Sequence, residues 1–370
     1  MRVDFLTENI NKSLPLIGKI LPVHSQVPVL SNILLEANKT SLTLYATDLE
    51  LGVKINIPAK IETEGTVTVP GKEFIDIINS LPKDRASLVE ENGSLVLSLR
   101  DNRMVFQTIS KDEFPNLFEK KGEKVHSFTQ KEFREIFSKI VFSVSLDETK
   151  PVLSGVLVYQ KEDGVDFVAT DGYRMSRVKI KAQKILETGS SFIISGRLVN
   201  EALSLKEEDK EKTLDLYIYK EGNQALFETQ NIVLVGRLIE GDYPNYERVI
   251  PESNKTVVTL GKEDFLQAIK IASVFARESA NIVKLKIEDG KLTIFSKSSG
   301  VGEGKASVDV KQDGEDNEIS FNVKFLIDFL RNTEGKEVIM EVNSPTEPAI
   351  FRTPDQKEYI HVVMPVRIQE

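Results

Sequence analysis

Cysteine is absent from the 370-residue chain, and histidine is scarce. Without cysteine the chain can form no disulfide, no thiolate metal site and no cysteine nucleophile. The three histidines, His24, His126 and His361, lie far apart in the sequence, which argues against a histidine metal site or a catalytic triad. We therefore expect no metal and no other cofactor.

Long apolar runs are also missing. No stretch approaches the roughly 18 apolar residues of a membrane span, and residues 1–5 form no apolar leader, so a cytoplasmic location is the default expectation. Positive charge is in the minority, with 48 Lys and Arg against 57 Asp and Glu and a net charge of −9. This balance argues against a general nucleic-acid binder, but a segregated basic face would still be compatible with DNA.

The sequence contains an internal repeat. Apolar residues at helical spacing recur in two segments per repeat: 7–21 and 71–81, 129–141 and 196–205, and 261–277 and 322–331. Alternating, strand-like segments follow each of them. This order predicts α+β architecture, with two helices packed on β-sheets in each of three domains at 1–122, 123–253 and 254–370. Pro15 predicts a kink or a late start in the first helix.

One turn occurs in two of the repeats. Ala46-Thr47-Asp48 matches Ala169-Thr170-Asp171, and the second copy continues as Gly172-Tyr173-Arg174-Met175. Aspartate followed by glycine favours a tight turn between strands, because glycine tolerates a positive φ and aspartate bonds its own backbone. We interpret the shared Ala-Thr-Asp as turn architecture and residues 172–175, which the other copies lack, as the functional part.

Charge is unevenly distributed. The six helical segments sum to +3, whereas the whole chain is −9. A solvated helix face explains this excess, and so does a weakly basic lining that attracts phosphates without reading bases. The sequence leaves both interpretations open.

Three other features of the sequence invite a functional interpretation. The glycine-rich segment 298–306 has one residue too few between Gly300 and Gly304 for a phosphate loop and lacks the Ser or Thr after the lysine, so we interpret it as a flexible loop. A hydrolytic pair of Asp171 and Asp242 has no pattern to bring the two together. The apolar segment 362–366 fits a last strand of the third repeat, a partly exposed patch for partner peptides, or both.

Taken in order, these motifs resemble the bacterial replicative sliding clamp, the beta subunit of DNA polymerase III. The resemblance covers the whole chain and rests on segments 28–35, 46–50, 114–117, 169–174, 246–251 and 364–367. It implies a non-catalytic protein that dimerises head-to-tail into a six-domain ring around duplex DNA, without sequence specificity. Its implied partners are the polymerase catalytic subunit, the clamp loader and other proteins with clamp-binding peptides, and no membrane. The alternative is a repeat scaffold that binds peptides without encircling DNA.

The resemblance also implies sites. A partner-peptide pocket between the second and third domains would comprise Leu153, Thr170, Gly172, Tyr173, Arg174, Met175, Pro244, Arg248, Val249, Val362, Val363, Met364, Pro365, Val366 and Arg367. The apolar wall is expected from Leu153, Met175, Val249, Val363, Met364 and Pro365, and the orientation of polar peptide groups from Arg174, Arg248 and Arg367. Tyr173 replaces a histidine that is frequent in the family, and Gln369 and Glu370 extend beyond the usual end.

DNA contacts and a dimer interface are implied as well. The candidate DNA-binding residues are His24, where the family commonly has arginine, and Lys72, Lys131, Arg134, Arg197, Lys270, Arg277, Lys324 and Arg331. The dimer interface is expected to place Met104 and Phe106 of one subunit against Val274 and Phe275 of the other.

Overall fold

Helices and strands follow one another in three similar rounds, as the repeat predicts. The computed structural model describes residues 1–118, 120–147, 149–181, 183–205, 213–278 and 280–367. In each round a strand leads into a first helix, further strands follow, and a second helix precedes three more strands. The second helices are α3 (Gly71–Ser80), α5 (Gly196–Ser204) and α7 (Val323–Asn332), so their predicted starting points are confirmed.

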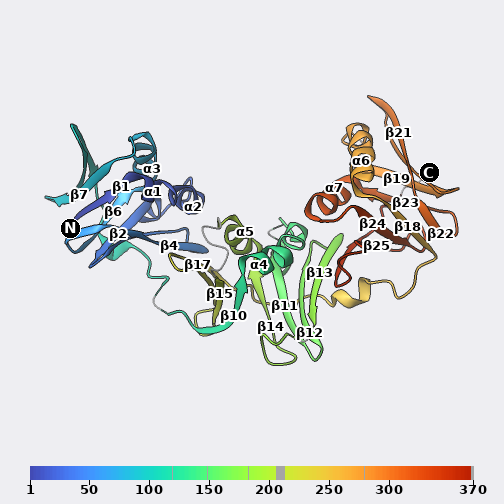
Figure 1. Ribbon diagram of the computed structural model, residues 1–370, viewed down its shortest axis with the longest axis horizontal. Coiled ribbons are helices and arrows are strands. Elements are labelled where there is room, and N and C mark those ends of the chain that lie inside the picture. Colours follow the sequence, from blue (N-terminus) through green and yellow to red (C-terminus); the bar gives the residue numbers. More distant parts are fainter. Residues whose placement is uncertain (119, 148, 182, 206–212, 279, 368–370) are drawn as a thin grey trace. The chain divides into compact units, whose positions relative to one another are not determined.

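The chain forms two compact units, and the middle repeat contributes to both. Unit 1 consists of Met1–Lys131 and Arg197–Leu238, and unit 2 of Glu132–Gly196 and Ile239–Glu370. Each unit contains one large and one small antiparallel sheet. Figure 1 shows the elements in chain order.

Unit 1 combines strands of the first and second repeats. Its small sheet has the order β5 (Lys60–Thr63), β1 (Arg2–Leu6), β7 (Arg85–Glu91), β8 (Ser94–Leu99), β9 (Asn102–Gln107). Its large sheet has the order β10 (Glu123–Thr129), β15 (Thr213–Tyr219), β16 (Gln224–Glu228), β17 (Ile232–Arg237), β4 (Leu51–Pro58), β3 (Ser41–Thr47), β2 (Asn32–Asn38), β6 (Gly65–Pro70). The pairing of β4 with β17 joins the two repeats into one sheet.

The first predicted helix is divided in two. Helix α1 (Thr7–Asn11) ends before Ser13, and α2 (Leu14–Ile20) carries Pro15 in its first turn. Proline is tolerated there because the first amides of a helix have no intrahelical acceptor. The helical segment begins at Thr7 and does not start late, but it is interrupted just before Pro15, in line with the predicted kink.

Unit 2 combines strands of the second and third repeats. Its large sheet has the order β14 (Ser191–Ser195), β11 (Gly155–Lys161), β12 (Gly164–Thr170), β13 (Arg174–Lys181), β26 (Tyr359–Val363), β25 (Ala349–Arg352), β24 (Glu337–Val342), β18 (Thr256–Gly261), β22 (Lys311–Gly314). Its small sheet has the order β21 (Gly302–Asp309), β20 (Lys291–Ser298), β19 (Ile282–Glu288), β23 (Asn317–Asn322). Helix α6 (Lys262–Ala276) packs on β20 and β21, and also contacts α7.

The third repeat has a dense core that supports the helices and the last strand. Phe265 and Ile269 of α6 and Leu326 and Phe329 of α7 are completely buried in it, together with Val363 of β26. In α6 and α7 the apolar residues at helical spacing are therefore the buried face.

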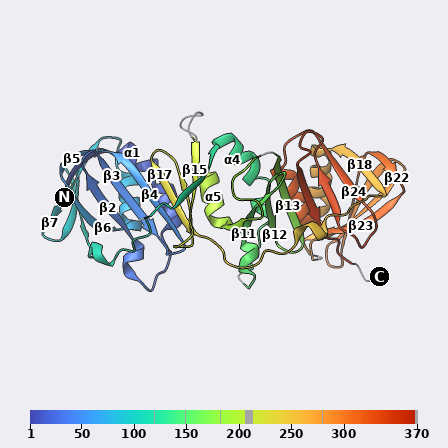
Figure 2. The same ribbon diagram turned by 90° about the horizontal axis from the view of Figure 1, so that it is seen from below.

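The central step of the nine-stranded sheet is the pairing of β13 with β26. These strands belong to different repeats and run antiparallel, with Arg174 opposite Val363 and Met175 opposite Val362. Figure 2 shows β11, β12 and β13 side by side as they approach this step. The ladder fixes the end of β26 against the start of β13, because a shift by one residue would turn every side chain to the wrong face.

Short 3-10 helices replace regular structure at several predicted element ends. Helix α4 (Gln130–Phe137) is shorter than the predicted segment 129–141, and residues 141–143 form the 3-10 helix η3 (Val141–Ser143). Strand β11 begins only at Gly155, because the preceding residues Pro151–Ser154 form η4. Two others are η1 (Pro28–Ser31) and η2 (Lys111–Glu113). Only residues 299–301 of the glycine-rich segment form a turn, which joins β20 to β21. Residues 302–306 are paired in strand β21, so the loop interpretation is wrong for most of the segment.

Candidate functional site

The repeated turn has the same hydrogen bonds in both copies. Thr170 Oγ1 donates to the Arg174 carbonyl at 2.7 Å, and Asp171 Oδ1 accepts from the Tyr173 and Arg174 amides at 2.9 Å. In the first repeat Thr47 Oγ1 donates to the Leu51 carbonyl at 2.9 Å. Asp48 Oδ1 accepts there from the amides of residues 50 and 51. The interpretation of Thr-Asp as turn architecture is confirmed, and Arg174 corresponds to Leu51.

A small apolar cavity lies beside the second copy of this turn. Its volume is about 110 Å³, and its lining comes from the turn, from η4, from the end of β26 and from η5 (Tyr246–Val249) with the preceding loop. Residues predicted for the pocket that line it are Leu153, Thr170, Gly172, Arg174, Met175, Pro244, Val249, Val362 and Met364. Segments that are far apart in the sequence thus meet at one hollow, which is large enough for one apolar side chain.

Val363 was assigned to the wrong face. It is completely buried in the core of the third repeat, whereas its neighbour Val362 lines the cavity. Side chains of a strand alternate between the two faces of a sheet, so adjacent valines on β26 cannot both reach the cavity. Met364, the next residue, lines the cavity, and its amide donates to the Tyr173 carbonyl at 2.9 Å.

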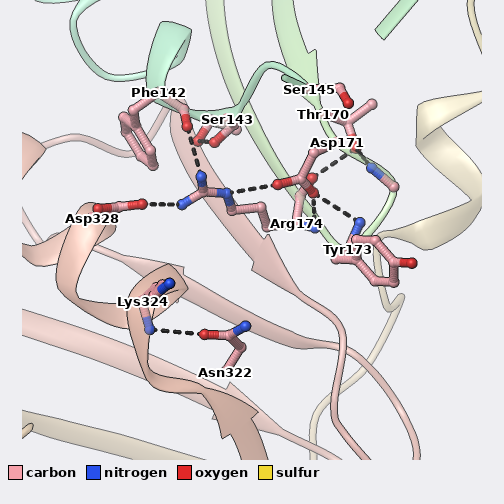
Figure 3. A network of polar contacts seen from close by, with 12 residues as sticks. Phe142, Ser143, Ser145, Thr170, Asp171, Tyr173, Arg174, Asn322, Lys324 and Asp328 are labelled. Carbon is pink, nitrogen blue, oxygen red and sulfur yellow. Dashed lines mark hydrogen bonds and ion pairs between the residues drawn. The ribbon is translucent and has the colours of Figure 1, made fainter. Parts of the chain in front are cut away.

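Arg174 is held by the protein itself (Figure 3). Its Nη1 donates to Asp328 Oδ2 of α7 at 2.6 Å, its Nη2 to the Phe142 carbonyl at 2.8 Å, and its Nε to Asp171 Oδ2 at 3.0 Å. The guanidinium carbon also lies 5.5 Å from the centre of the Phe142 ring and 4.7 Å from that of Phe325. With its side chain only 10% exposed, Arg174 forms part of the wall rather than a mobile hook for a ligand.

Two lining residues were missed, Asn245 and Tyr246. The Tyr246 hydroxyl donates to Oδ2 of the fully buried Asp166 at 2.6 Å, and Lys161 Nζ lies 2.9 Å from the same oxygen. Burial, together with this neighbouring carboxylate, raises the pKa of Tyr246. This hydrogen bond holds η5 against β12. The signal in the sequence was Tyr243-Pro244-Asn245, which matches Phe114-Pro115-Asn116 near the end of the first repeat.

The remaining predicted pocket residues do not line the cavity. Tyr173 is 61% exposed, and Lys150 Nζ lies 5.9 Å from its ring centre. Arg248 is exposed on η5. The tail residues Pro365 and Val366 are half-buried, and the Val366 amide donates to the Ser320 carbonyl at 2.8 Å. Arg367 is exposed, while Gln369 and Glu370 lie outside the described residues.

Three buried polar side chains form a hydrogen-bonded series on and next to strands β13 and β26. The Ser143 and Ser176 hydroxyls are 2.9 Å apart, and Ser176 Oγ lies 2.8 Å from His361 Nδ1. The imidazole is stacked on Phe329 with 5.0 Å between ring centres. Burial, with the nearby Arg174 charge, lowers the pKa of His361 to about 3, so the imidazole is neutral at physiological pH.

The candidate DNA-binding residues are all exposed: His24, Lys72, Lys131, Arg134, Arg197, Lys270, Arg277, Lys324 and Arg331. Arg197 is already paired, because its guanidinium donates to the Asp48 carboxylate of the repeated turn. Its charge is therefore partly compensated within unit 1.

The candidate residues of the dimer interface differ in how much of their side chains is exposed. Val274 on α6 is 56% exposed, and Phe275 is partly buried. Met104 is partly buried on β9, but Phe106 is only 5% exposed, with its ring 5.8 Å from that of Phe74. The Phe106 side chain belongs to the core of its own domain and has little surface left for another subunit. Val105, which points to the other face of β9, is 48% exposed and offers apolar surface instead.

The described part of the chain offers neither a cluster of metal-ligating side chains nor a helix that could span a membrane. It contains no group of three or more His, Asp or Glu residues placed to hold a metal ion. Among the helices described there, none is long and apolar enough to cross a membrane.

Comparisons with known proteins agree over nearly the whole length. Models of the N-terminal, central and C-terminal domains of the DNA polymerase III beta subunit match residues 1–118, 127–245 and 247–367. The beta sliding clamp of Synechococcus elongatus is 29% identical over 378 residues, covering 100% of both chains. That of Staphylococcus aureus is 28% identical, covering 98% of this chain and 97% of the relative.

Solved structures are similar in the same way. The Thermotoga maritima DNA polymerase III beta subunit is 28% identical with a TM-score of 0.89, and a Bartonella birtlesii sliding clamp bound to griselimycin is 26% identical with a TM-score of 0.94. Each comparison covers 100% of both chains.

Proposed function

Since the chain belongs to the DNA polymerase III beta subunit family, the bacterial sliding clamps, we propose that it encircles duplex DNA and tethers the replicative polymerase to it. As a member of this family it is a non-catalytic processivity factor. The observation that carries the proposal is the succession of all three family domains, in order, along one chain. We assign the domains to residues 1–122, 123–253 and 254–370, and the protein to the cytoplasm.

The charge distribution supports a ring that slides. A protein that neutralises few phosphates binds DNA weakly, so little free energy is needed to move it along the duplex. Contacts to phosphate also carry no sequence information, so no position on the DNA is preferred. Weakly cationic helices within an acidic chain meet this requirement. Retention would then depend on topology and not on tight contact. We assign the DNA-facing role to the exposed helix cations, with Lys72 and Lys324 ahead of the paired Arg197.

The second part of the proposal is a head-to-tail homodimer. In each unit the small sheet ends in an unpaired edge strand, β9 in unit 1 and β21 in unit 2. Such edges invite pairing with another chain unless they are covered. Joining β9 of one protomer to β21 of its partner would cover both edges and bring Met104 and Val105 towards Val274 and Phe275, and two such contacts close a ring.

The third part is the site for partner peptides. The cavity beside Arg174 is lined mainly by aliphatic side chains and has few polar groups, which suits an apolar side chain on an extended segment. We assign to it the clamp-binding peptides of the polymerase catalytic subunit, the clamp loader and other replication proteins.

Two measurements test the ring. Native mass spectrometry at micromolar concentration should give about twice the chain mass of 41.6 kDa. After loading by a clamp loader, the protein should stay on nicked circular DNA and leave when the circle is linearised. A monomer, or equal retention on both DNA forms, contradicts the ring and favours the alternative, a scaffold that binds peptides without encircling DNA.

A further inference from the structure

The second helices of the three repeats share one register. Their fourth residues, Phe74, Val199 and Leu326, are all buried. Their sixth residues are all acidic: Asp76, Glu201 and Asp328. The register places these carboxylates at equivalent points of the fold, so their partners can be compared directly.

In unit 1 the sixth residue of α5 forms an ion pair with the preceding repeat. Lys19 Nζ of α2 lies 3.0 Å from Glu201 Oε2. Neither residue lines a described cavity. In unit 1 this ion pair therefore links two repeats without contributing to a described cavity.

In unit 2 the equivalent pair includes a residue of the peptide site. Asp328 of α7 also binds a cation of the preceding repeat, and that cation is Arg174, which lines the apolar cavity. Asp328 itself does not line it. Phe325, one turn earlier on α7, lies over the same guanidinium, so α7 holds Arg174 by charge and by an aromatic face.

We propose that Asp328 is a positioning residue of the peptide site: it holds Arg174 against the wall and thereby keeps the cavity open. The inference rests on the proposed peptide-binding function. The cavity of about 110 Å³ is comparable to the volume of one side chain. Without the Asp328 carboxylate, Nη1 loses its charged acceptor, and the long arginine side chain can turn into the space that the peptide needs. A preformed site binds more tightly because less ordering remains to be done on binding.

The test is a double-mutant cycle read by peptide affinity. The probe is a fluorescein-labelled peptide with the sequence of the C-terminal segment of the polymerase catalytic subunit from the same genome, followed by fluorescence anisotropy. Asp328→Asn, which keeps the shape and removes the charge, is expected to weaken binding about tenfold. In the Arg174→Met background the same substitution should have no further effect, because the residue that Asp328 positions is gone.

Two variants separate positioning from general loosening. Glu201→Gln breaks the equivalent pair in unit 1 and should leave peptide affinity unchanged. Asp328→Glu keeps the carboxylate and should retain most of the affinity. Circular dichroism and the unfolding temperature establish that each variant is folded.

Several results would overturn the inference. These are an unchanged affinity in Asp328→Asn, an equal loss with and without Arg174, an equal loss in Glu201→Gln, or a loss in Asp328→Glu as large as in Asp328→Asn. If the unsubstituted protein does not bind the peptide, the proposed peptide site itself fails and the inference fails with it. A loss confined to the variants leaves the site intact, so the two failures are distinguishable.

Discussion

Leu49 and Gly172 occupy the same place in two copies of one turn, and both have a left-handed backbone, with φ of 78° and 89°. Their amides both donate to the threonine hydroxyl two residues earlier, at 3.0 Å. The turn therefore requires a positive φ, which glycine adopts without strain and leucine does not.

This geometry predicts the effect of adding a Cβ to Gly172. Gly172→Ala should lower the free energy of unfolding by about 1–2 kcal/mol. The added methyl group meets no atom within 4 Å, so the cost comes from the backbone and not from a clash. Gly300→Ala is the matched control, because that glycine is equally open but has no left-handed φ. Equal effects of the two substitutions in denaturant unfolding would show that the turn tolerates a side chain.

Substitution of the neighbouring residues Val363 and Met364 should have different effects, one on the free energy of unfolding and the other on peptide affinity. Val363→Ala removes methyl groups from a fully buried position, and it should cost about 1–3 kcal/mol of unfolding free energy. Met364→Ala should cost little stability but weaken the peptide about tenfold, because Met364 lines the cavity. The expectation is wrong if Val363→Ala, while still folded, reduces peptide affinity more than Met364→Ala.

The anchor of η5 gives a third prediction. Tyr246→Phe removes the hydroxyl donor from the buried Asp166 carboxylate and leaves it only the Lys161 ammonium, while Asp166 Oδ1 already has no hydrogen-bond partner among the described residues. We expect a loss of about 1–3 kcal/mol in unfolding free energy. Tyr243→Phe serves as control, since its hydroxyl does not contact Asp166 but forms hydrogen bonds with backbone groups, among them the Val168 carbonyl at 3.4 Å. A larger loss in Tyr243→Phe would mean that the Asp166 hydrogen bond is not what anchors η5.

His361 predicts how stability changes with pH. Its pKa is about 3 in the folded protein against an ordinary value of 6.5, so protons bind preferentially to the unfolded chain between these values. The contribution is complete above pH 6.5 and is lost as the pH falls, by up to about 1.4 kcal/mol per pH unit. The carboxylates with lowered pKa values, such as Asp84 and Asp147, lose their contributions only below about pH 4.

His361→Phe should therefore flatten the stability profile between pH 7 and 5. The measurement is the denaturation midpoint of both proteins across this range. An equally steep decline in the variant would assign the pH dependence to another group. The phenyl ring can replace the imidazole in the stack on Phe329, at the cost of the Ser176 hydrogen bond.

The sequence was sufficient to predict the order of elements and the location of the site. Periodicity located the second helices, because their buried residues recur at helical spacing. The repeated Thr-Asp pair located the turn. The partners of the turn were not predictable in this way. Arg174 and Asp328 are 154 residues apart, and no local pattern connects them. Val363 was misplaced because the resemblance assigned it to the pocket together with Val362, although neighbouring residues of a strand point to opposite faces.

The pairing of β13 with β26 has a consequence for synthesis on the ribosome. Strand β13 can pair with β26 only after β26 has been synthesised, and His361, the partner of Ser176, follows it by 185 residues. At about 5–20 residues per second this edge of β13 stays uncovered for about ten seconds or longer. An open strand edge attracts other unfolded chains, and lysine or arginine on the strand is one protection against this. Strand β13 carries Arg174, Arg177, Lys179 and Lys181, a cationic sequence suited to a strand that must remain unpaired while its partner is being made.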